Sequence, residues 1–111
     1  MTPKEILLEI GLREGEAEIY MALLRLGTSN VAGIKEATRF YRTTIYDFLE
    51  KLLNKGLVSY VVENNVKFYS AASAERLREY MTEKQELVEE MLPQLARLSK
   101  TAIPKLKVET Y

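Results

Sequence analysis

The 111-residue sequence contains no cysteine and no histidine. The first absence excludes disulfides, thiol nucleophiles and cysteine zinc sites, and the second excludes an imidazole base and histidine metal ligands. The sequence therefore lacks the side chains that most enzyme mechanisms use. The carboxylates that remain are scattered, without a nucleophile, metal motif or phosphate loop beside them. We therefore expect a protein that is not an enzyme and uses no cofactor.

Net charge and long apolar runs are also lacking. Sixteen basic and sixteen acidic residues cancel, so any contact with nucleic acid must be local rather than spread over the whole chain. No apolar run approaches the roughly 20 residues that span a bilayer, and the N-terminus has no basic segment followed by an apolar signal core. These features predict a cytoplasmic protein with no membrane partner, and the length suits one domain.

The other predicted elements of the chain are arranged around the stretch from Arg39 to Val58. Apolar residues recur in it at spacings of three and four, which places them on one face of a helix: Ile45, Phe48, Leu49, Leu52 and Leu53. The opposite face carries Thr43, Asp47, Glu50 and Asn54. Lys55 and Gly56 predict the end of the helix, because a cation is favourable in the last turn and glycine adopts positive φ beyond it.

A β-hairpin is predicted directly after this helix. Apolar residues lie on either side of Glu63-Asn64-Asn65, and asparagine tolerates the left-handed backbone of a tight turn. A short helix is predicted before it, capped by Asn30 and with Val31, Ile34 and Ala37 facing inward. The order helix, turn, helix, hairpin predicts a winged helix-turn-helix, with the helix pair at residues 30–53.

The short helix contains Gly33. A glycine within a helix costs about 1 kcal/mol relative to alanine. Its presence therefore indicates close packing or a tight turn rather than helical propensity.

Two further helices are predicted at the N-terminus. Thr2 caps the first, which has an apolar face of Ile6, Leu7 and Ile10 and ends at Gly11. The second runs from Glu14 to Leu26, and Gly27 stops it. Its expected buried residues are Ala17, Tyr20, Met21 and Leu24. Arg13 is an unusual residue at its cap position.

The longest periodic segment begins at Ser73 and ends near Lys100. Residues in steps of four and three form the seam of a coiled coil: Leu77, Met81, Lys84, Val88, Met91, Leu95 and Leu98. A helix of this length reaches roughly 40 Å, more than a small domain can cover. We therefore expect a homodimer through this seam, weakened at Lys84. Pro93 is expected to kink or divide the helix.

Charge is divided along this helix. Residues 75–90 hold six acids and three bases, and residues 91–107 hold four bases and no acid. This favours antiparallel pairing of the helix, or reflects a solvated face.

The sequence therefore predicts three regions: a winged-helix domain at 1–72, a dimerisation helix at 73–100, and a tail at 101–111. The tail alternates like a strand, and we expect an edge strand, a disordered end or the start of a further domain.

With these segments in view, the sequence resembles the TrmB family of largely archaeal transcriptional regulators over residues 3 to about 100. The first matching motif is LREGEAEIYMALLRLG, with Glu16, Ala17, Tyr20, Ala22, Leu23, Leu24 and Gly27. The second is YRTTIYDFLEKLLNKGLV, with Arg42, Tyr46, Leu49, Lys55, Gly56, Leu57 and Val58. Tyr69-Ser70-Ala71 resembles the close of the family's wing. The resemblance implies a winged-helix DNA-binding domain followed by a coiled-coil helix.

The sequence also departs from the family. The family often has glycine at the position of Arg39 and proline at that of Tyr41, so a base and an aromatic residue here either extend the DNA surface or reshape the turn. Full-length members carry a sugar-binding domain after the helical segment, and this sequence ends where that domain would begin. Sugar sensing is therefore not carried over.

The candidate DNA-binding residues lie around the second helix of the pair and the hairpin. They are Lys35, Arg39, Tyr41, Arg42, Thr43, Thr44, Tyr46, Lys51, Asn65 and Lys67. Side chains and amides in a first helical turn can meet phosphates or base edges. Tyr46 either reaches a phosphate or packs on the preceding helix. Asp47 either accepts from a cytosine amino group or pairs with Lys51, and we expect the pair.

The leading hypothesis is a sequence-specific, homodimeric regulator that binds double-stranded DNA, with this helix in the major groove and the hairpin on the backbone. Residues 35–67 hold six bases and four acids, a modest excess that a dimer doubles. The alternatives are a winged helix that binds protein through Tyr41, Tyr46 and Tyr60, and an architectural chromatin protein, which would be expected to be more basic.

Overall fold

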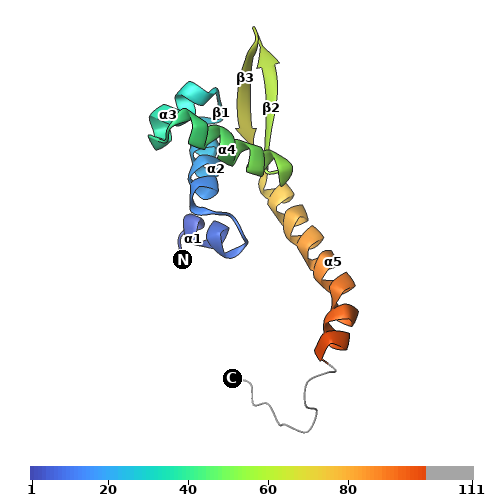
Figure 1. Ribbon diagram of the computed structural model, residues 1–111. Coiled ribbons are helices and arrows are strands. Elements are labelled where there is room, and N and C mark those ends of the chain that lie inside the picture. Colours follow the sequence, from blue (N-terminus) through green and yellow to red (C-terminus); the bar gives the residue numbers. More distant parts are fainter. Residues whose placement is uncertain (100–111) are drawn as a thin grey trace. The chain divides into compact units, whose positions relative to one another are not determined.

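The computed structural model describes residues 1–99 of the chain. Its elements are α1 (Pro3–Glu9), α2 (Glu14–Leu26), β1 (Thr28–Ser29), α3 (Val31–Thr38), α4 (Arg42–Asn54), β2 (Val58–Glu63), β3 (Val66–Ala71) and α5 (Ala74–Ser99) (Figure 1). This confirms the predicted fold class: mainly α with a small β-hairpin, a winged helix-turn-helix followed by a long helix. The predicted tail, residues 101–111, lies outside the described residues.

The chain divides into two compact units. The first, Met1–Tyr80, contains α1 to α4, the three strands and the first turns of α5. The second begins at Met81 and contains the remaining described turns of α5. The helix-turn-helix pair and the hairpin therefore share one unit, and α5 starts in that unit.

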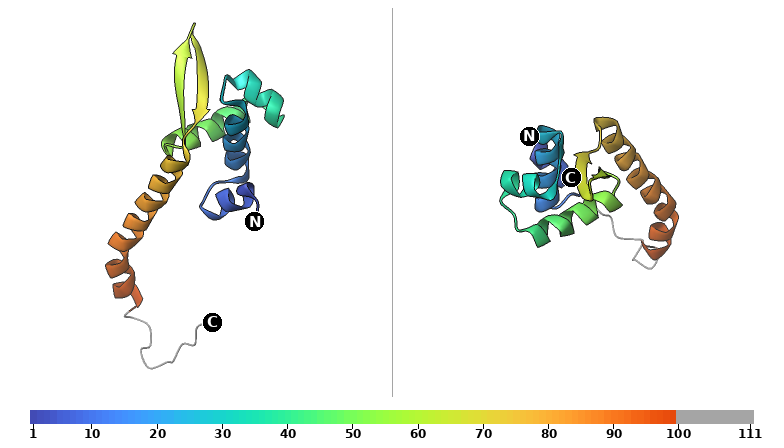
Figure 2. Two further views of the ribbon diagram at one scale, coloured as in Figure 1. Left: turned by 180° about the vertical axis from the view of Figure 1, so that it is seen from behind. Right: turned by 90° about the horizontal axis from the view of Figure 1, so that it is seen from above.

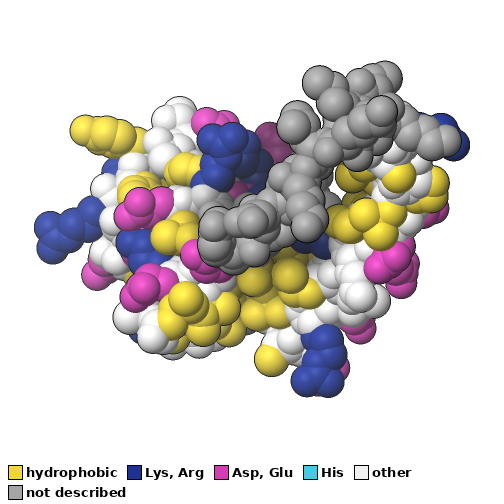
Figure 3. Space-filling model, turned by 90° about the horizontal axis from the view of Figure 1, so that it is seen from below, with side chains coloured by type: hydrophobic (Ala, Val, Ile, Leu, Met, Phe, Trp, Pro, Cys, Tyr) yellow, Lys and Arg dark blue, Asp and Glu magenta, His cyan; other side chains and the backbone are white. Residues whose placement is uncertain are grey.

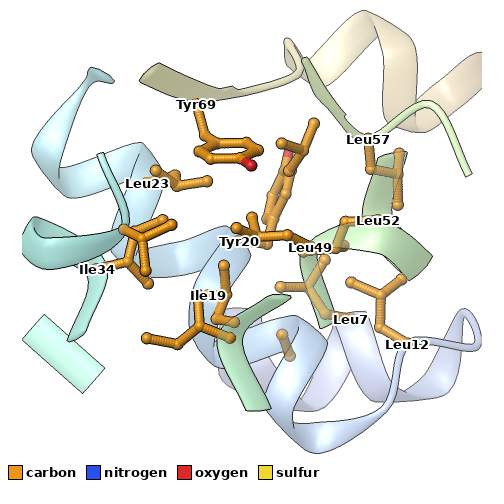
Figure 4. Packing of buried hydrophobic residues seen from close by; sticks show 14 of the residues in the cluster. Leu7, Leu12, Ile19, Tyr20, Leu23, Ile34, Leu49, Leu52, Leu57 and Tyr69 are labelled. Atoms are coloured by element: carbon orange, nitrogen blue, oxygen red, sulfur yellow. The ribbon is translucent and has the colours of Figure 1, made fainter. Parts of the chain in front are cut away.

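The core of the first unit surrounds α2. Ile19, Tyr20 and Leu23 are buried there, and Figure 4 shows Tyr20 among side chains from α1, α4 and the sheet. Its hydroxyl donates a hydrogen bond to the carbonyl oxygen of Ala72 at 3.0 Å, which ties α2 to the residue after the hairpin. Full burial of one such aliphatic side chain contributes about 1.5–3 kcal/mol. This core holds α3 and α4 against α2 and so fixes the helix-turn-helix.

The helix starts follow the predicted caps. Thr2 accepts from the amide of Glu5 at 3.2 Å, and Asn30 accepts from that of Gly33 at 2.9 Å. A Cβ atom on Gly33 would collide with the Ser29 hydroxyl, which confirms the close packing expected there. The unusual cap at Arg13 is completed from inside the helix, because the Glu16 carboxylate accepts from the Arg13 amide at 2.7 Å.

Three expectations about the helices are wrong, and a fourth, at Pro93, is wrong as far as it concerns a division of the helix. Ile6 is 46% exposed and Leu24 57%, and Ala37 is also exposed. Leu24 follows the fully buried Leu23 in the same turn of α2, so the buried face is centred one position earlier than helical spacing predicted. Pro93 does not divide α5, which runs as one helix through it. A helix loses one backbone hydrogen bond at an internal proline, and its other bonds can maintain the path.

The three strands form an antiparallel sheet in the order β1-β3-β2. The hairpin of β2 and β3, called the wing from here on, extends beyond the neighbouring α3 and α4 (Figure 1 and the left view of Figure 2). Asn64 and Asn65 have φ of 51° and 64°, which confirms the predicted tight turn. The two-residue β1 was not predicted. It pairs with Ser70 and Tyr69 at the base of the wing.

Candidate nucleic-acid interface

The first turn of α4 is open to a ligand. Arg39 ends α3 in the left-handed conformation, with φ of 64°, and Tyr41 then occupies the cap position of α4 without a side-chain hydrogen bond to the helix. The first amides of a helix have no partner within it and lie at the positive end of the helix dipole. An anion at this turn would therefore meet backbone donors as well as the Arg42 side chain.

The structure brings the start of α4 next to the wing. Between them is a groove of about 470 Å³, called the helix–wing groove, lined by Asn30, Val31, Ala32, Arg42, Tyr46, Asn65, Val66, Lys67 and Tyr69. Arg42 and Lys67 are 25 residues apart in the sequence, but both line this groove. Two cations and several hydrogen-bonding groups thus converge on one concave surface, and no acid is among its lining residues.

A second hollow, of about 510 Å³, adjoins the first through Ala32 and Arg42. We call it the turn hollow, and it is lined by Ala32, Lys35, Glu36, Arg39 and Arg42. Together the two hollows have four basic residues and one acid. Among residues 1–99, no ion pair involves Lys35, Arg39 or Arg42. The neutral chain therefore carries a local basic surface, which suits a phosphate backbone.

Three tyrosines lie near the wall formed by the wing. The rings of Tyr60 and Tyr69 have centroids 5.7 Å apart, and the ammonium of Lys67 lies 4.6 Å from the Tyr60 centroid. Burial raises the pKa of the Tyr69 phenol, and the neighbouring Tyr46 and Tyr60 raise it further. Tyr69 is only 3% exposed, so its neutral phenol forms a packed part of the groove wall.

Most of the candidate residues gather at these two hollows. Arg42, Tyr46, Asn65 and Lys67 line the helix–wing groove, and Lys35 and Arg39 line the turn hollow. Nearby, Tyr41 is 79% exposed, Thr43 is exposed and Thr44 is half-buried.

Lys51 is placed apart from both hollows. Its ammonium lies 5.7 Å from the centroid of the Phe48 ring. The expected pair of Asp47 with Lys51 is wrong, since no such ion pair exists within the described part of the chain. Asp47 and Glu50 are exposed. Carboxylates at these two positions would repel a phosphate, which leaves the first turn of α4 as the part of this helix suited to an anion.

Sequence reasoning missed part of the groove. Asn30, Val31 and Ala32 from the start of α3 and Val66 and Tyr69 from β3 line it as well. Asn30 was recognised only as a helix cap, because its place beside the wing depends on tertiary packing.

The seam of α5 is exposed in the unit that begins at Met81. Its apolar members there are between 41% and 71% exposed: Met81, Val88, Met91, Leu95 and Leu98. Leu87 and Leu92, which were not assigned to the seam, are 60% and 47% exposed and widen the apolar stripe. Leu77 differs, because it packs against the core of the first unit.

Two other kinds of site were searched for over residues 1–99. No group of three or more acids there is arranged to hold a metal ion, and no helix is long and apolar enough to cross a membrane. The face in Figure 3 mixes basic, acidic and hydrophobic side chains, so its visible part lacks a broad area of one charge.

Comparison with known sequences identifies the family. The sequence model of the family described as "Sugar-specific transcriptional regulator TrmB" matches residues 7–75, which span the helix-turn-helix and the wing. The chain belongs to the TrmB family. No curated protein sequence matches it at a significant level.

Solved structures agree with the fold of this TrmB-family chain. TrmBL2, described as an archaeal chromatin protein with a novel mode of DNA binding, is 27% identical with a TM-score of 0.70. The match covers 96% of this chain and 47% of TrmBL2, so this chain spans about half the length of that relative.

Two more distant structures show the same fold. The ST1889 protein of Sulfolobus tokodaii is 18% identical with a TM-score of 0.62, and the match covers 77% of this chain and 88% of that one. The oxidised form of MarR from E. coli is 16% identical with a TM-score of 0.56, and the match covers 91% and 72% of the two chains.

Proposed function

We propose that this chain is a sequence-specific, DNA-binding transcriptional regulator that acts as a homodimer in the cytoplasm. The observation that carries the proposal is the convergence of Lys35, Arg39, Arg42 and Lys67 on two adjoining hollows of a chain with no net charge. In this arrangement α4 lies in the major groove, where Arg42 and Thr43 meet phosphates or base edges. The wing, with Asn65 and Lys67, lies on the backbone.

The relatives support this choice among winged-helix functions. The family is described as one of transcriptional regulators, and TrmBL2, at 27% identity, is described as binding DNA. Sugar recognition is not part of the proposal, because the matched region, residues 7–75, is the winged helix.

The exposed stripe on α5 is the proposed dimer contact. Exposed apolar side chains along one face of a helix favour a partner, and a second copy supplies the same stripe. Residues 1–72 then form the DNA-binding domain and residues 73–100 the dimerisation helix. Light scattering at micromolar concentration should report a dimer, and a monomer would reject this part of the proposal. Lys84→Leu should tighten the dimer, because it replaces a charge within the apolar seam.

A second candidate, an architectural chromatin protein, is favoured by the description of TrmBL2 as a chromatin protein. Such a protein coats DNA with little dependence on sequence, and it gains affinity from a broadly basic surface. The balanced charge of this chain favours the regulator. A winged helix that binds protein is the third candidate, supported by Tyr41 at 79% exposure and Tyr46 at 50%.

Binding to DNA fragments at several salt concentrations distinguishes the three. Fluorescence anisotropy with genomic fragments and random-sequence duplexes should show tight binding to a minority of fragments and weaker, strongly salt-dependent binding to the rest. Equal affinity for all duplexes would favour the chromatin protein. Absence of binding at low salt would reject both DNA-binding candidates and leave the protein-binding winged helix, with Tyr41 and Tyr46 as the first residues to change.

A further inference from the structure

The C-terminal end of α4 is held by an arginine from the first turn of α5. Nε of Arg76 donates to the carbonyl oxygen of Gly56 at 3.1 Å, and Nη2 donates to that of Lys55 at 3.1 Å. Carbonyls at a helix end lack helical partners and lie at the negative end of the dipole. The planar guanidinium binds two of them at once, which the single ammonium of a lysine reproduces less well.

Gly56 makes this approach possible. Its φ is 72°, and a Cβ atom there would lie 2.6 Å from Nη2 of Arg76. Glycine therefore serves both the left-handed turn after α4 and the close approach of the guanidinium. Arg76 is held from its own helix as well, through an ion pair with Glu79 at 3.3 Å.

Lys55 is also held from the opposite side. Its ammonium lies 2.5 Å from the carboxylate of Glu16, a side chain with no exposed surface. Glu16 belongs to the first turn of α2. The end of α4 is thus fixed to α2 and to the start of α5 at one place, which we call the α4 anchor: Glu16, Lys55, Gly56 and Arg76. All four residues lie within the unit Met1–Tyr80.

The anchor contributes to the direction of α4, together with the core contacts of Ile45, Leu49 and Leu52. The helix has 13 residues and is therefore about 20 Å long, so a tilt of about 5° at the anchor would move its first turn by roughly 1.7 Å. Such a displacement is large compared with the range of acceptable hydrogen-bond lengths, which is about 0.5 Å. Arg42 lies in that first turn, at the helix–wing groove.

We infer that Arg76 is a positioning residue for DNA binding. It touches no nucleic acid, but by capping α4 it sets where Arg42 meets the DNA. Its hydrogen bonds also connect the end of α4 directly to the start of α5, the proposed dimerisation helix. The inference rests on the proposed function, because it concerns how α4 is aimed at DNA.

Arg76→Met tests the inference, since methionine keeps the apolar stem and removes the guanidinium. Arg78→Met is the matched control on the same turn, because the Arg78 side chain is 78% exposed and pairs with Glu75 at the surface. Affinities for the best-bound genomic fragment are measured by anisotropy at several salt concentrations. The temperature is chosen so that circular dichroism shows every variant folded.

We expect Arg76→Met to bind about 3- to 10-fold more weakly at every salt concentration, with an unchanged salt slope. Arg76→Lys should recover part of the loss, and Arg78→Met should stay within about 2-fold. The salt slope is the deciding measurement, because a residue that contacts phosphate directly would lower it by about one unit.

Three results overturn the inference while the wild-type chain still binds DNA. They are unchanged affinity in Arg76→Met despite a lower melting temperature, a slope reduced by about one unit, and an equal loss in Arg78→Met. If Arg76→Met fails to fold, Arg76→Lys decides alone, and its wild-type affinity would overturn the inference. A wild-type chain that binds no DNA would instead reject the proposed function.

Discussion

The two ends of α4 can be compared directly. At its C-terminal end the cations are engaged, since Lys55 pairs with the buried Glu16 and Arg76 binds backbone carbonyls. Around its N-terminal end, by contrast, Lys35, Arg39 and Arg42 have no ion pair within residues 1–99 and line open hollows. The comparison teaches that a basic residue indicates a binding surface only where its neighbours leave its charge unsatisfied. It predicts stability effects at one end and binding effects at the other.

The largest effect is expected at the engaged end. Glu16→Ala removes the carboxylate that binds both Lys55 and the Arg13 amide. It should lower the free energy of unfolding by about 3 kcal/mol, because a partly buried ammonium and a helix-terminal amide lose their partner. Chemical denaturation measures the loss.

Glu18→Ala is the matched control for this prediction. Glu18 lies on the same helix but pairs with Lys4 at a more exposed position. Its loss should cost less than about 1 kcal/mol. Equal losses in the free energy of unfolding for the two variants would contradict the prediction, because the Glu16 carboxylate would then contribute no more than a surface ion pair.

Arg42→Ala makes the complementary change at the open end. We expect specific DNA binding to weaken by about 1–3 kcal/mol, because the side chain is proposed to read a base or bind a phosphate at the groove edge. Thermal stability should stay within about 0.5 kcal/mol, since the side chain lies outside the core. Anisotropy and thermal unfolding measured together check both parts, and a fold destabilised as much as by Glu16→Ala would contradict the assignment.

Arg39→Gly should change stability and binding in opposite directions. A non-glycine residue in the left-handed region is strained by about 1–2 kcal/mol, and glycine relieves this strain. Glycine also loses more conformational entropy on folding, so the net gain in the free energy of unfolding should be about 0.5–1 kcal/mol. Loss of the base from the turn hollow should weaken DNA binding several-fold. Arg39→Ala is the control, because it removes the same base without relieving the backbone.

Lys67→Ala should give the smallest effect. A phosphate contact on the wing lowers affinity about equally for cognate and random duplexes and reduces the salt slope by about one unit, because one fewer counterion is released. Anisotropy against both duplexes over a salt series measures this. A loss confined to the cognate duplex would mean that Lys67 reads bases, and the wing would then resemble α4 in its role.

Much of the fold follows from local patterns in the sequence. The Asn64-Asn65 turn, the Thr2 and Asn30 caps and the stop at Gly56 were all predicted, because each depends on residues within a few positions of one another. The two-residue β1 was missed, since no period can be recognised in two residues. Leu24 was wrongly expected to be buried, because several apolar residues in this turn of α2 fit helical spacing, and Leu23 is the one that faces the core.

The functional surface was only partly predictable for a related reason. Position in a helix-turn-helix was enough to select Arg42, and turn chemistry drew attention to Asn65. The α4 anchor was not predicted, because Glu16, Lys55 and Arg76 come from three distant segments. The same limit applies to Lys51, which was grouped with Arg42 on one helix although its ammonium lies over Phe48.

The short β1 has a consequence for the mechanics of the wing. It pairs only with Tyr69 and Ser70, so from Phe68 to the turn the hairpin is a two-stranded ribbon, in which Val61 and Val62 are exposed. Isolated two-stranded ribbons are marginally stable. We therefore expect amide hydrogens near the turn to exchange faster than those of α4. In the proposed complex, Lys67 would then contact DNA from a flexible element that tolerates variation in duplex width, whereas Arg42 would contact it from a rigid helix.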